Sequence, residues 1–184
     1  MSEGEARGLT PPVGADDHAD GPADAPVTLV EYGDYECGYC GMAYPIVKSL
    51  RRRLGDRLRF VFRNFPLAEA HPRARHAAEA AESAGAQGTY WPMHDTLFEH
   101  QHALEDPDLL GYARALRLDA DRVARELAEG AYAKKVRADF RGGVRSGVNG
   151  TPTFFINGRR YEGPWADEEK FASALRKEAA AVGR

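Results

Sequence analysis

The sequence has only two cysteines in 184 residues, Cys37 and Cys40, and no second C-x-x-C pair. A structural zinc site needs about four ligands. His71 and His76 could join the two cysteines only in an unusual fold, so zinc binding is disfavoured. We therefore expect no metal ion, and nothing in the sequence calls for an organic cofactor.

Long apolar runs are also missing. No stretch is long enough to span a membrane, and the polar N-terminus, beginning Met1-Ser2-Glu3-Gly4, contains no apolar leader segment. We therefore expect a cytoplasmic protein that does not associate with membranes. It would be periplasmic or extracellular if a leader had been removed from the N-terminus.

A strong excess of one charge is absent as well. The 25 Lys and Arg residues are balanced by 28 Asp and Glu residues, which gives a net charge of −3. This balance does not favour binding to nucleic acid or to an anionic membrane surface. Hydrophobic residues make up 43% of the chain, enough for a sizeable core. We expect one soluble, monomeric domain.

The chain begins with a segment that differs in composition from the rest. Residues 1–24 are rich in Gly, Pro, Ala and Asp and show no periodicity, so we expect a flexible tail followed by a domain over 25–184. Hydrophobic periodicity predicts the elements of that domain. They are a strand over 27–32, a helix over 38–54, a strand over 57–63, a helical block over about 67–147, a strand over 151–156, a hairpin turn at Asn157-Gly158, a strand over 159–162 and a last helix from Asp167.

The two cysteines lie where the first predicted strand gives way to the first predicted helix. Unpaired N–H groups and the positive end of the macrodipole at a helix start stabilise a thiolate. We expect Cys37 to be exposed at this start and Cys40 to lie one turn inside, close enough to form a disulfide bond. A lone C-x-x-C in this context indicates a redox-active dithiol, although a structural disulfide is the alternative.

The two thiols are expected to have different roles. Cys37, as the exposed member, should be the nucleophile, and Cys40 should be the resolving thiol that releases the mixed disulfide. Gly38 and Tyr39 add no charge between them, whereas Glu36 adds a negative charge that should raise the pKa of Cys37. We therefore expect a redox couple of intermediate potential.

The order of these elements resembles the α/β thioredoxin fold with an inserted α-helical subdomain, and the motifs resemble those of the DsbA-like thiol–disulfide oxidoreductase family. The likeness covers roughly residues 25–180. It is carried by Val27–Tyr32, Cys37-Gly38-Tyr39-Cys40, Gly150–Gly158, and Tyr90–Asp95 with Leu97-Phe98. The resemblance implies an enzyme that exchanges disulfides with protein or small-thiol substrates and draws on a partner redox system.

Pro152 is the next residue that the resemblance singles out. In that family the proline at this place is cis, its loop lies against the active-site pair, and the residue before it offers its backbone to an extended substrate. Thr151 would take this role here. The alternative is an ordinary trans proline at the start of a strand.

Glu31 is unusual because it lies in an apolar strand, on the same face as Val27 and Leu29. If this strand is central, both of its faces are covered, and burial should raise the pKa of the carboxyl group. We expect Glu31 to exchange a proton with Cys40 during release of the mixed disulfide, a role that the resemblance also implies. The alternative is a glutamate at a strand end that reaches water.

Two tyrosines flank the dithiol in the sequence. Tyr35 and Tyr39 are expected to be exposed and to frame a shallow apolar surface for an extended or unfolded peptide. We therefore assign both to substrate binding, together with Thr151 and Pro152.

Two other classes of function share parts of this pattern. A glutathione-dependent transferase or isomerase of related fold normally keeps a single Ser or Cys at the active position. A non-catalytic thioredoxin-like binding module has no need of Cys40. The intact Cys37–Cys40 pair argues against both.

Overall fold

The computed structural model describes residues 8–182. They divide into two compact units: the first runs to Gly33, resumes over Met42–Arg63 and returns at Arg141, and the second comprises Asp34–Gly41 and Asn64–Phe140. The elements follow in the order β1 (His18–Asp20), β2 (Val27–Gly33), α1 (Gly38–Leu54), a 3-10 turn (Gly55–Arg57), β3 (Leu58–Asn64), α2 (Ala74–Ala86), α3 (Tyr90–Glu99), α4 (Asp106–Ala115), α5 (Ala120–Glu129), α6 (Ala133–Arg145), β4 (Thr153–Ile156), β5 (Arg159–Arg160) and α7 (Glu168–Val182).

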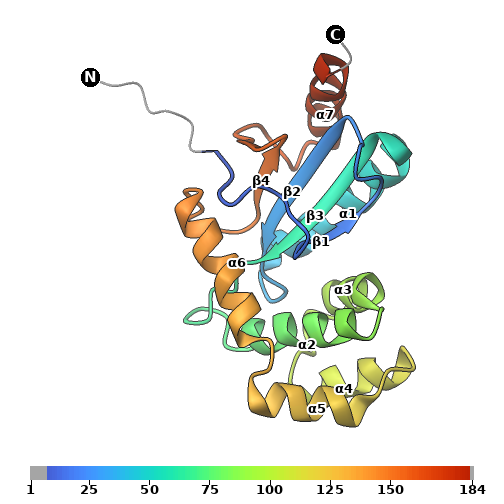
Figure 1. Ribbon diagram of the computed structural model, residues 1–184, viewed down its shortest axis with the longest axis vertical. Helices are drawn as coiled ribbons and strands as arrows, with labels where there is room; N and C mark the ends of the chain where they lie inside the picture. Colours follow the sequence, from blue (N-terminus) through green and yellow to red (C-terminus); the bar gives the residue numbers. More distant parts are fainter. Residues whose placement is uncertain (1–7, 183–184) are drawn as a thin grey trace. The chain divides into compact units, whose positions relative to one another are not determined.

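The first unit is built on a five-stranded sheet with the order β1-β3-β2-β4-β5 (Figure 1). β2 is the middle strand, and it pairs antiparallel with β4, so that Glu31 lies opposite Phe154 and Val30 opposite Phe155. All residues of β2 except Thr28 are buried. A strand covered on both faces needs apolar residues at nearly every position, which explains the continuous apolar run in its sequence.

Two helices of the first unit are joined through complementary charges. α7 packs against β2, and its first turn contacts the C-terminal part of α1. Ser49 Oγ donates to Glu168 Oε1 at 2.6 Å, and Arg53 donates to both Glu168 and Glu169. Acidic residues at a helix start and basic residues at a helix end also complement the two helix dipoles.

The hairpin between β4 and β5 forms as the sequence predicted. Asn157 and Gly158 have φ angles of 48° and 79°, and positive φ at both central residues is what a type I′ turn requires. The strand after the turn is shorter than expected, because β5 covers only Arg159–Arg160.

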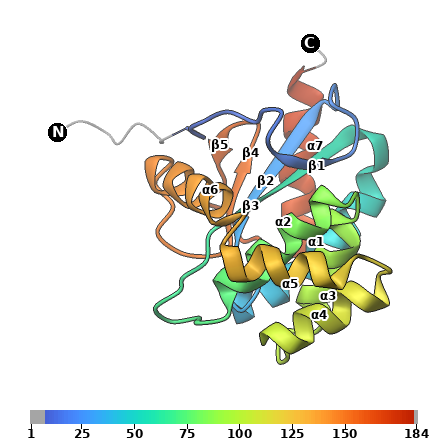
Figure 2. The ribbon, with the colours of Figure 1, turned by 60° about the horizontal axis from the view of Figure 1, so that its bottom comes forward.

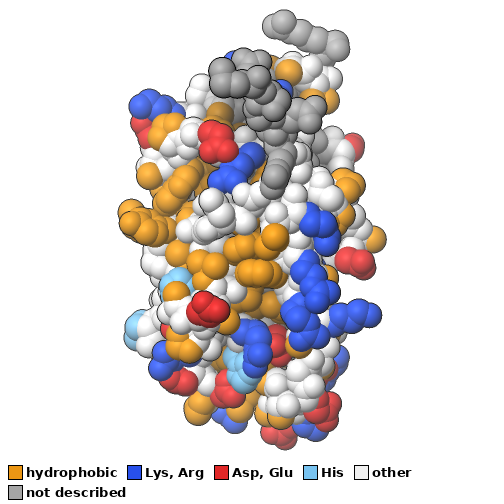
Figure 3. Space-filling model, turned by 90° about the vertical axis from the view of Figure 1, so that its left-hand side faces the viewer, with side chains coloured by type: hydrophobic (Ala, Val, Ile, Leu, Met, Phe, Trp, Pro, Cys, Tyr) orange, Lys and Arg blue, Asp and Glu red, His pale blue; other side chains and the backbone are white. Residues whose placement is uncertain are grey.

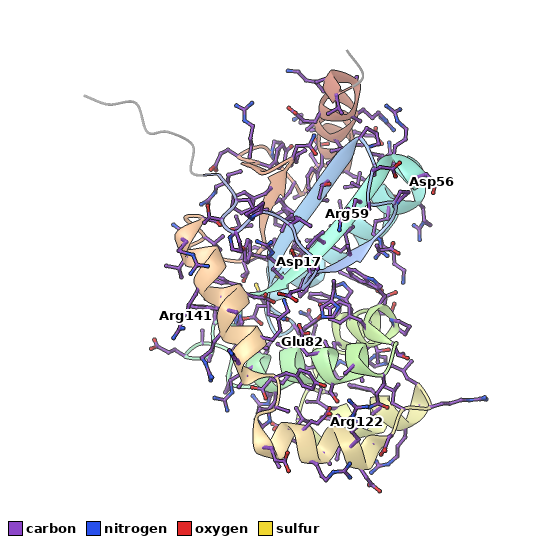
Figure 4. The ribbon with its side chains drawn as sticks, in the orientation of Figure 1. Asp17, Asp56, Arg59, Glu82, Arg122 and Arg141 are labelled. Atoms are coloured by element: carbon purple, nitrogen blue, oxygen red, sulfur yellow. The ribbon has the colours of Figure 1, made fainter. Side chains whose placement is uncertain are left out.

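The expectation of a flexible tail over 1–24 is wrong for the part that the structure describes, and residues 1–7 lie outside it. β1 pairs antiparallel with β3. Asp17, labelled in Figure 4, accepts two hydrogen bonds from the buried Arg63 guanidinium, at 2.8 and 2.9 Å. Arg63 also donates to the carbonyl oxygen of Pro11. Composition could not reveal that this segment is ordered, because the partner of Asp17 lies 46 residues further along the chain.

The second unit is helical apart from its connecting segments, and Figure 2 brings α2 to α5 forward. α2 is its central helix, since it contacts α3, α4 and α5. Small side chains let neighbouring helices approach closely, and six buried alanines of α2 supply them: Ala74, Ala77, Ala78, Ala80, Ala81 and Ala84. α2 to α6 fall within the stretch that the periodicity marked as helical.

Candidate active site

The two cysteines stand at the start of α1. Cys37 directly precedes the helix, and Cys40 lies in its first turn. The carbonyl oxygen of Cys37 accepts the first helical hydrogen bond, from the N–H of Gly41 at 3.0 Å. Side chains three residues apart at a helix start lie near one another on the same side. The predicted placement of the pair at a strand-to-helix transition is confirmed.

The expectation that Cys37 is exposed is wrong. Its exposed fraction is only 5%, although Cys40 is buried still more completely. Gln101, which follows α3, lies over this turn and donates from Nε2 to the carbonyl oxygens of Tyr35 and Cys37, both at 2.9 Å. The dithiol therefore lies in a turn whose backbone is covered by a side chain from elsewhere in the helical unit.

Asp34 organises the turn that carries Cys37. Its side chain is fully buried, and Oδ1 accepts from the backbone N–H groups of Glu36 at 2.8 Å and Cys37 at 3.2 Å. Oδ2 accepts from the N–H of Leu67 at 2.9 Å and lies 2.8 Å from Nδ1 of His71. One carboxylate thus joins the cysteine turn to the segment that precedes α2.

His71 gains a positive charge more readily in this site. Because an ionised carboxylate can only accept hydrogen bonds, Nδ1 of His71 donates to Asp34. Partial burial by itself would lower the pKa of His71, but the hydrogen bond to Asp34 and the charge of Asp34 outweigh it and raise this pKa. The charges of Cys37 and Glu36 act on His71 in the same direction.

The charge of Glu36 is offset by Arg73. The backbone N–H of Arg73 donates to Glu36 Oε2 at 2.8 Å, and the guanidinium lies 3.5 Å from Oε1. Arg73 also pairs with Glu105. The redox potential expected from Glu36 alone therefore leaves out the charges of Arg73 and His71. Both come from the segment before α2.

Tyr35 was expected at the surface but is buried, with an exposed fraction of 1%. Its hydroxyl lies 3.0 Å from Nδ1 of His94 and 3.4 Å from the hydroxyl of Tyr90. Its ring packs on Phe98 with centroids 4.8 Å apart. Tyr35 is therefore a core residue of the helical unit, and its assignment to substrate binding is withdrawn. The sequence did not reveal this, because all three partners come from α3.

Tyr39 is exposed, as expected, with an exposed fraction of 66%. Met42, three residues further along α1, is also exposed. Side chains with this spacing are neighbours on a helix surface, so the two form a short apolar strip at the start of α1. Figure 3 shows hydrophobic side chains, in orange, standing at the surface among charged ones.

Glu31 is buried in the middle strand of the sheet. A methyl group on Gly33 would come within 3.2 Å of Glu31 Oε1 and 2.4 Å of the Phe62 ring. Gly33 thus leaves the space that the carboxyl group and the ring use. The catalytic role of Glu31 stays a prediction.

Thr151 and Pro152 immediately precede β4, and the peptide bond between them is cis. Both residues are partly exposed. Thr153 Oγ1 donates to the carbonyl oxygen of Gly150 at 2.7 Å, which closes the loop leading into the strand. The part of Thr151 and Pro152 in substrate binding stays a prediction.

The two histidines considered for zinc each pair with an aspartate. His71 pairs with Asp34, and Nδ1 of His76 lies 2.6 Å from Asp106 Oδ1. Within residues 8–182, no group of three or more His, Cys, Asp or Glu side chains is placed to hold a metal ion.

Sequence reasoning missed Asp34 and Gln101. One signal was available for Asp34, which stands three residues before Cys37, a spacing at which an aspartate side chain often accepts from a backbone N–H at a turn or helix start. Gln101 has no such signal, because it acts from a distant part of the chain. His71 was considered only as a metal ligand.

A family model described as thioredoxin matches residues 15–177. The chain belongs to this thioredoxin family. Its structure resembles oxidised BdbD from Bacillus subtilis, with a TM-score of 0.81 and 25% identity over 90% of this chain and 94% of that chain. The structure also resembles a thioredoxin-like oxidoreductase from Silicibacter pomeroyi, with a TM-score of 0.75 and 25% identity over 89% of this chain and 93% of that chain. Wolbachia pipientis alpha-DsbA1 shares the fold, with a TM-score of 0.80 and 18% identity over 97% of this chain and 98% of that chain.

These matches confirm the thioredoxin fold and the resemblance to DsbA-like thiol–disulfide oxidoreductases. The family match and the two structures at 25% identity support the thiol–disulfide oxidoreductase class that the sequence predicted for this thioredoxin-family chain.

The curated relatives of this thioredoxin-family chain carry a different name. It is 51% identical over 158 residues to Na(+)/H(+) antiporter NhaA 1 of Salinispora arenicola, which is 85% of this chain and 24% of the relative. It is 46% identical over 158 residues to Na(+)/H(+) antiporter NhaA of Herminiimonas arsenicoxydans, a match that covers 85% of this chain and 25% of the relative. The chain spans about a quarter of the length of the curated relatives it matches.

The expected cytoplasmic localisation is wrong, because these relatives are antiporters, which are membrane proteins. None of the helices within residues 8–182 has both the length and the apolar character needed to cross a lipid bilayer.

Proposed function

We propose that the chain exchanges the Cys37–Cys40 dithiol and disulfide with protein substrates. The observation that carries the proposal is the turn at the start of α1, where Asp34 holds the N–H of Cys37 and Cys40 follows in the first helical turn. The N–H groups and the macrodipole at a helix start favour a thiolate at this position. Cys37 is therefore the nucleophile and Cys40 the resolving thiol.

The exchange proceeds in two steps. In the reducing direction, the Cys37 thiolate attacks one sulfur of a substrate disulfide, whose S–S bond breaks as a mixed disulfide forms and the other substrate sulfur leaves as a thiolate. The Cys40 thiolate then attacks the Cys37 sulfur and releases the second substrate sulfur. Two electrons pass to the substrate, and the Cys37–Cys40 disulfide remains. The oxidising direction reverses both steps, and a partner redox system resets the pair.

Glu31 is our candidate for the group that takes the proton of Cys40. Its burial in the middle strand of the sheet supports this role, since a buried carboxyl group can hold a proton near neutral pH. Replacing Glu31 with Gln should slow turnover at neutral pH. Equal rates for the variant and the parent across the pH range would remove Glu31 from the mechanism.

Tyr39 is proposed to contact an extended peptide substrate, and substrate binding is proposed for Thr151 and Pro152 as well. Tyr39 projects into solvent next to Cys37, and Thr151 and Pro152 are partly exposed at the entry to β4. Replacing Tyr39 with Ser should raise the KM for a protein disulfide more than the KM for a small disulfide. Equal changes for both substrates would argue against peptide contact.

The test of the whole proposal uses the two thiols separately. A Cys37→Ser variant should reduce insulin disulfides at least about a thousandfold more slowly than the parent, because the nucleophile is lost. A Cys40→Ser variant should accumulate a mixed disulfide on Cys37, which mass spectrometry detects. A Cys37→Ser variant with parental activity would contradict the proposal.

The same variants separate the two other classes of function. A glutathione-dependent transferase would keep its activity without Cys40. A non-catalytic binding module would hold its partner equally well when either cysteine is replaced. Exchange that needs both thiols argues against both classes.

A second candidate rests on the 51% identity to a segment of a Na(+)/H(+) antiporter. We propose that the substrate or covalent partner of the dithiol is such a transporter. The Cys40→Ser variant, incubated with membranes that contain the antiporter, should then trap an antiporter cysteine in the mixed disulfide. Recovery of water-soluble proteins alone would exclude this candidate.

A further inference from the structure

Four ionisable side chains lie around the turn that carries Cys37, and they form two pairs, each of one acidic and one basic residue. Asp34 pairs with His71 at 2.8 Å, and Glu36 pairs with Arg73. The arginine keeps its charge throughout the physiological pH range, whereas the imidazole does not. The net charge beside the thiol therefore depends on one titratable group.

The geometry joins that group directly to the cysteine turn. The Asp34 carboxylate accepts from the N–H of Cys37 through Oδ1 and from Nδ1 of His71 through Oδ2. The Asp34 side chain is fully buried, while a quarter of the His71 side chain remains exposed. His71 can thus exchange its proton with water while its partner stays inside the protein.

The two protonation states of His71 leave different charges near Cys37. When His71 is protonated, its charge cancels that of Asp34. When it is neutral, the buried Asp34 carboxylate is left as an uncompensated negative charge, which opposes ionisation of a neighbouring thiol.

We propose that His71 is a positioning residue of the dithiol that sets how readily Cys37 ionises, by neutralising Asp34 when it is protonated. The inference rests on the proposed function, since it assigns a regulating group to the same nucleophile. It makes the reactivity of Cys37 dependent on the protonation of a side chain whose Nδ1 is hydrogen-bonded to Asp34.

The coupling must be reciprocal, because linked protonation equilibria act equally on both groups. A thiolate at Cys37 favours a protonated His71, because the negative charge of Cys37 raises the pKa of His71. Glu36 acts on His71 in the same direction. Its own charge is offset by Arg73, which is in turn shared with Glu105.

The chain offers a matched control. His76 pairs with Asp106 in a second His–Asp contact, at 2.6 Å, but both of those side chains are partly exposed and neither belongs to the cysteine turn. A substitution of His76 removes the same type of pair without removing the charge beside Asp34.

The experiment measures the rate of Cys37 alkylation by iodoacetamide as a function of pH. It uses the full-length Cys40→Ser variant, so that Cys37 is the one thiol that can react. His71→Asn keeps an amide donor for Asp34 but removes the titratable charge. We expect it to raise the midpoint of the alkylation profile by about one pH unit, which means about tenfold slower alkylation below both midpoints. The midpoint for His76→Asn should equal that of the background.

A second readout tests reciprocity. The His71 imidazole, followed by NMR, should titrate at a higher pH when Cys37 is a thiolate than after Cys37 has been alkylated. His71→Ala, which lacks both charge and donor, should shift the Cys37 profile at least as far as His71→Asn.

Two results would overturn the inference. One is an unchanged midpoint in a folded His71→Asn variant, which would reduce His71 to a hydrogen-bond donor. The other is an equal shift in His76→Asn. Alkylation needs no disulfide substrate, so loss of insulin reduction by the parent would defeat the proposed function without altering this measurement.

Discussion

Asp34 and Asp139 are both buried carboxylates of the helical unit, but different kinds of donor hold them. Asp34 accepts from three backbone N–H groups and from His71. Asp139 accepts from the backbone and side chain of Asn64, at 3.1 and 2.9 Å, and from Lys135 at 2.6 Å. Only the first carboxylate has a partner whose charge changes near neutral pH.

Asp139 also belongs to a hydrogen-bond network that is centred on Asn64. Asn64 also donates to Glu82 of α2, labelled in Figure 4, at 2.8 Å, so that its amide joins α2 to Asp139 of α6. Burial raises the pKa of Asp139, although the ion pair with Lys135 opposes the rise. Burial alone therefore does not distinguish the two carboxylates. What distinguishes Asp34 is its hydrogen bond to the turn that carries Cys37.

The largest effect is expected for Asp34→Ala. It removes the side-chain acceptor of three backbone N–H groups and of His71, so the free energy of unfolding should fall by about 4 kcal/mol, and thiol–disulfide exchange should fall with it. Urea unfolding and insulin reduction measure the two effects. The matched control is Asp106→Ala at the exposed His76 pair, which should change stability by no more than about 0.5 kcal/mol. Equal stabilities of the two variants would contradict the role given to Asp34.

A smaller effect is expected for Asp139→Ala. The loss of its hydrogen bonds to Asn64 and Lys135 should lower the free energy of unfolding by about 2 kcal/mol. The folded variant should exchange disulfides at the parental rate, because Asp139 belongs to a structural network. Reduced exchange by a fully folded Asp139→Ala protein would show that the two carboxylates are not separate in function.

Gln101→Ala should have a still smaller effect on stability. It removes the two hydrogen bonds to the carbonyl oxygens of Tyr35 and Cys37, for a loss of about 1 kcal/mol. The turn should also become more accessible, so iodoacetamide should modify Cys37 faster at a pH where the thiol is fully ionised. The exposed neighbour His102 provides a control, because His102→Ala should leave that rate unchanged. A slower or equal rate in Gln101→Ala would mean that Gln101 does not cover the thiol.

The smallest effect concerns the pH dependence of stability. Because the pKa of Asp139 is raised in the folded state, folding favours its protonated form. This contribution is fully present below the pKa of the unfolded chain and is lost as the pH rises through the folded pKa. The stability of the parent relative to Asp139→Asn should therefore decrease as the pH rises over that range. Urea unfolding of both proteins at several pH values measures the difference in their free energies of unfolding. If the parent became more stable relative to Asp139→Asn as the pH rises, the prediction would be wrong.

Local patterns in the sequence were enough for much of the fold. The strand at Val27, the helix from Gly38 and the turn at Asn157-Gly158 all appear where periodicity and turn chemistry predicted them. These features depend on neighbours within a few residues, so the sequence contains the information directly.

The errors concern residues whose partners are distant in the chain. Asp17 was assigned to a flexible tail because its partner Arg63 lies in β3. Tyr35 was placed at the surface because its aromatic partners lie in α3. Exposure and order depend on which distant side chains fold onto a residue, and no local pattern records that.

The order of the elements and the spacing of Cys37 and Cys40 were enough to place the two cysteines at the start of a helix, since helix starts and turns follow from adjacent residues. The charges that act on that dithiol became visible only in the folded chain. His71 reaches Asp34, and Arg73 reaches Glu36, across 37 residues in each case. Electrostatic interactions depend on distance through space, and folding alone brings these groups together.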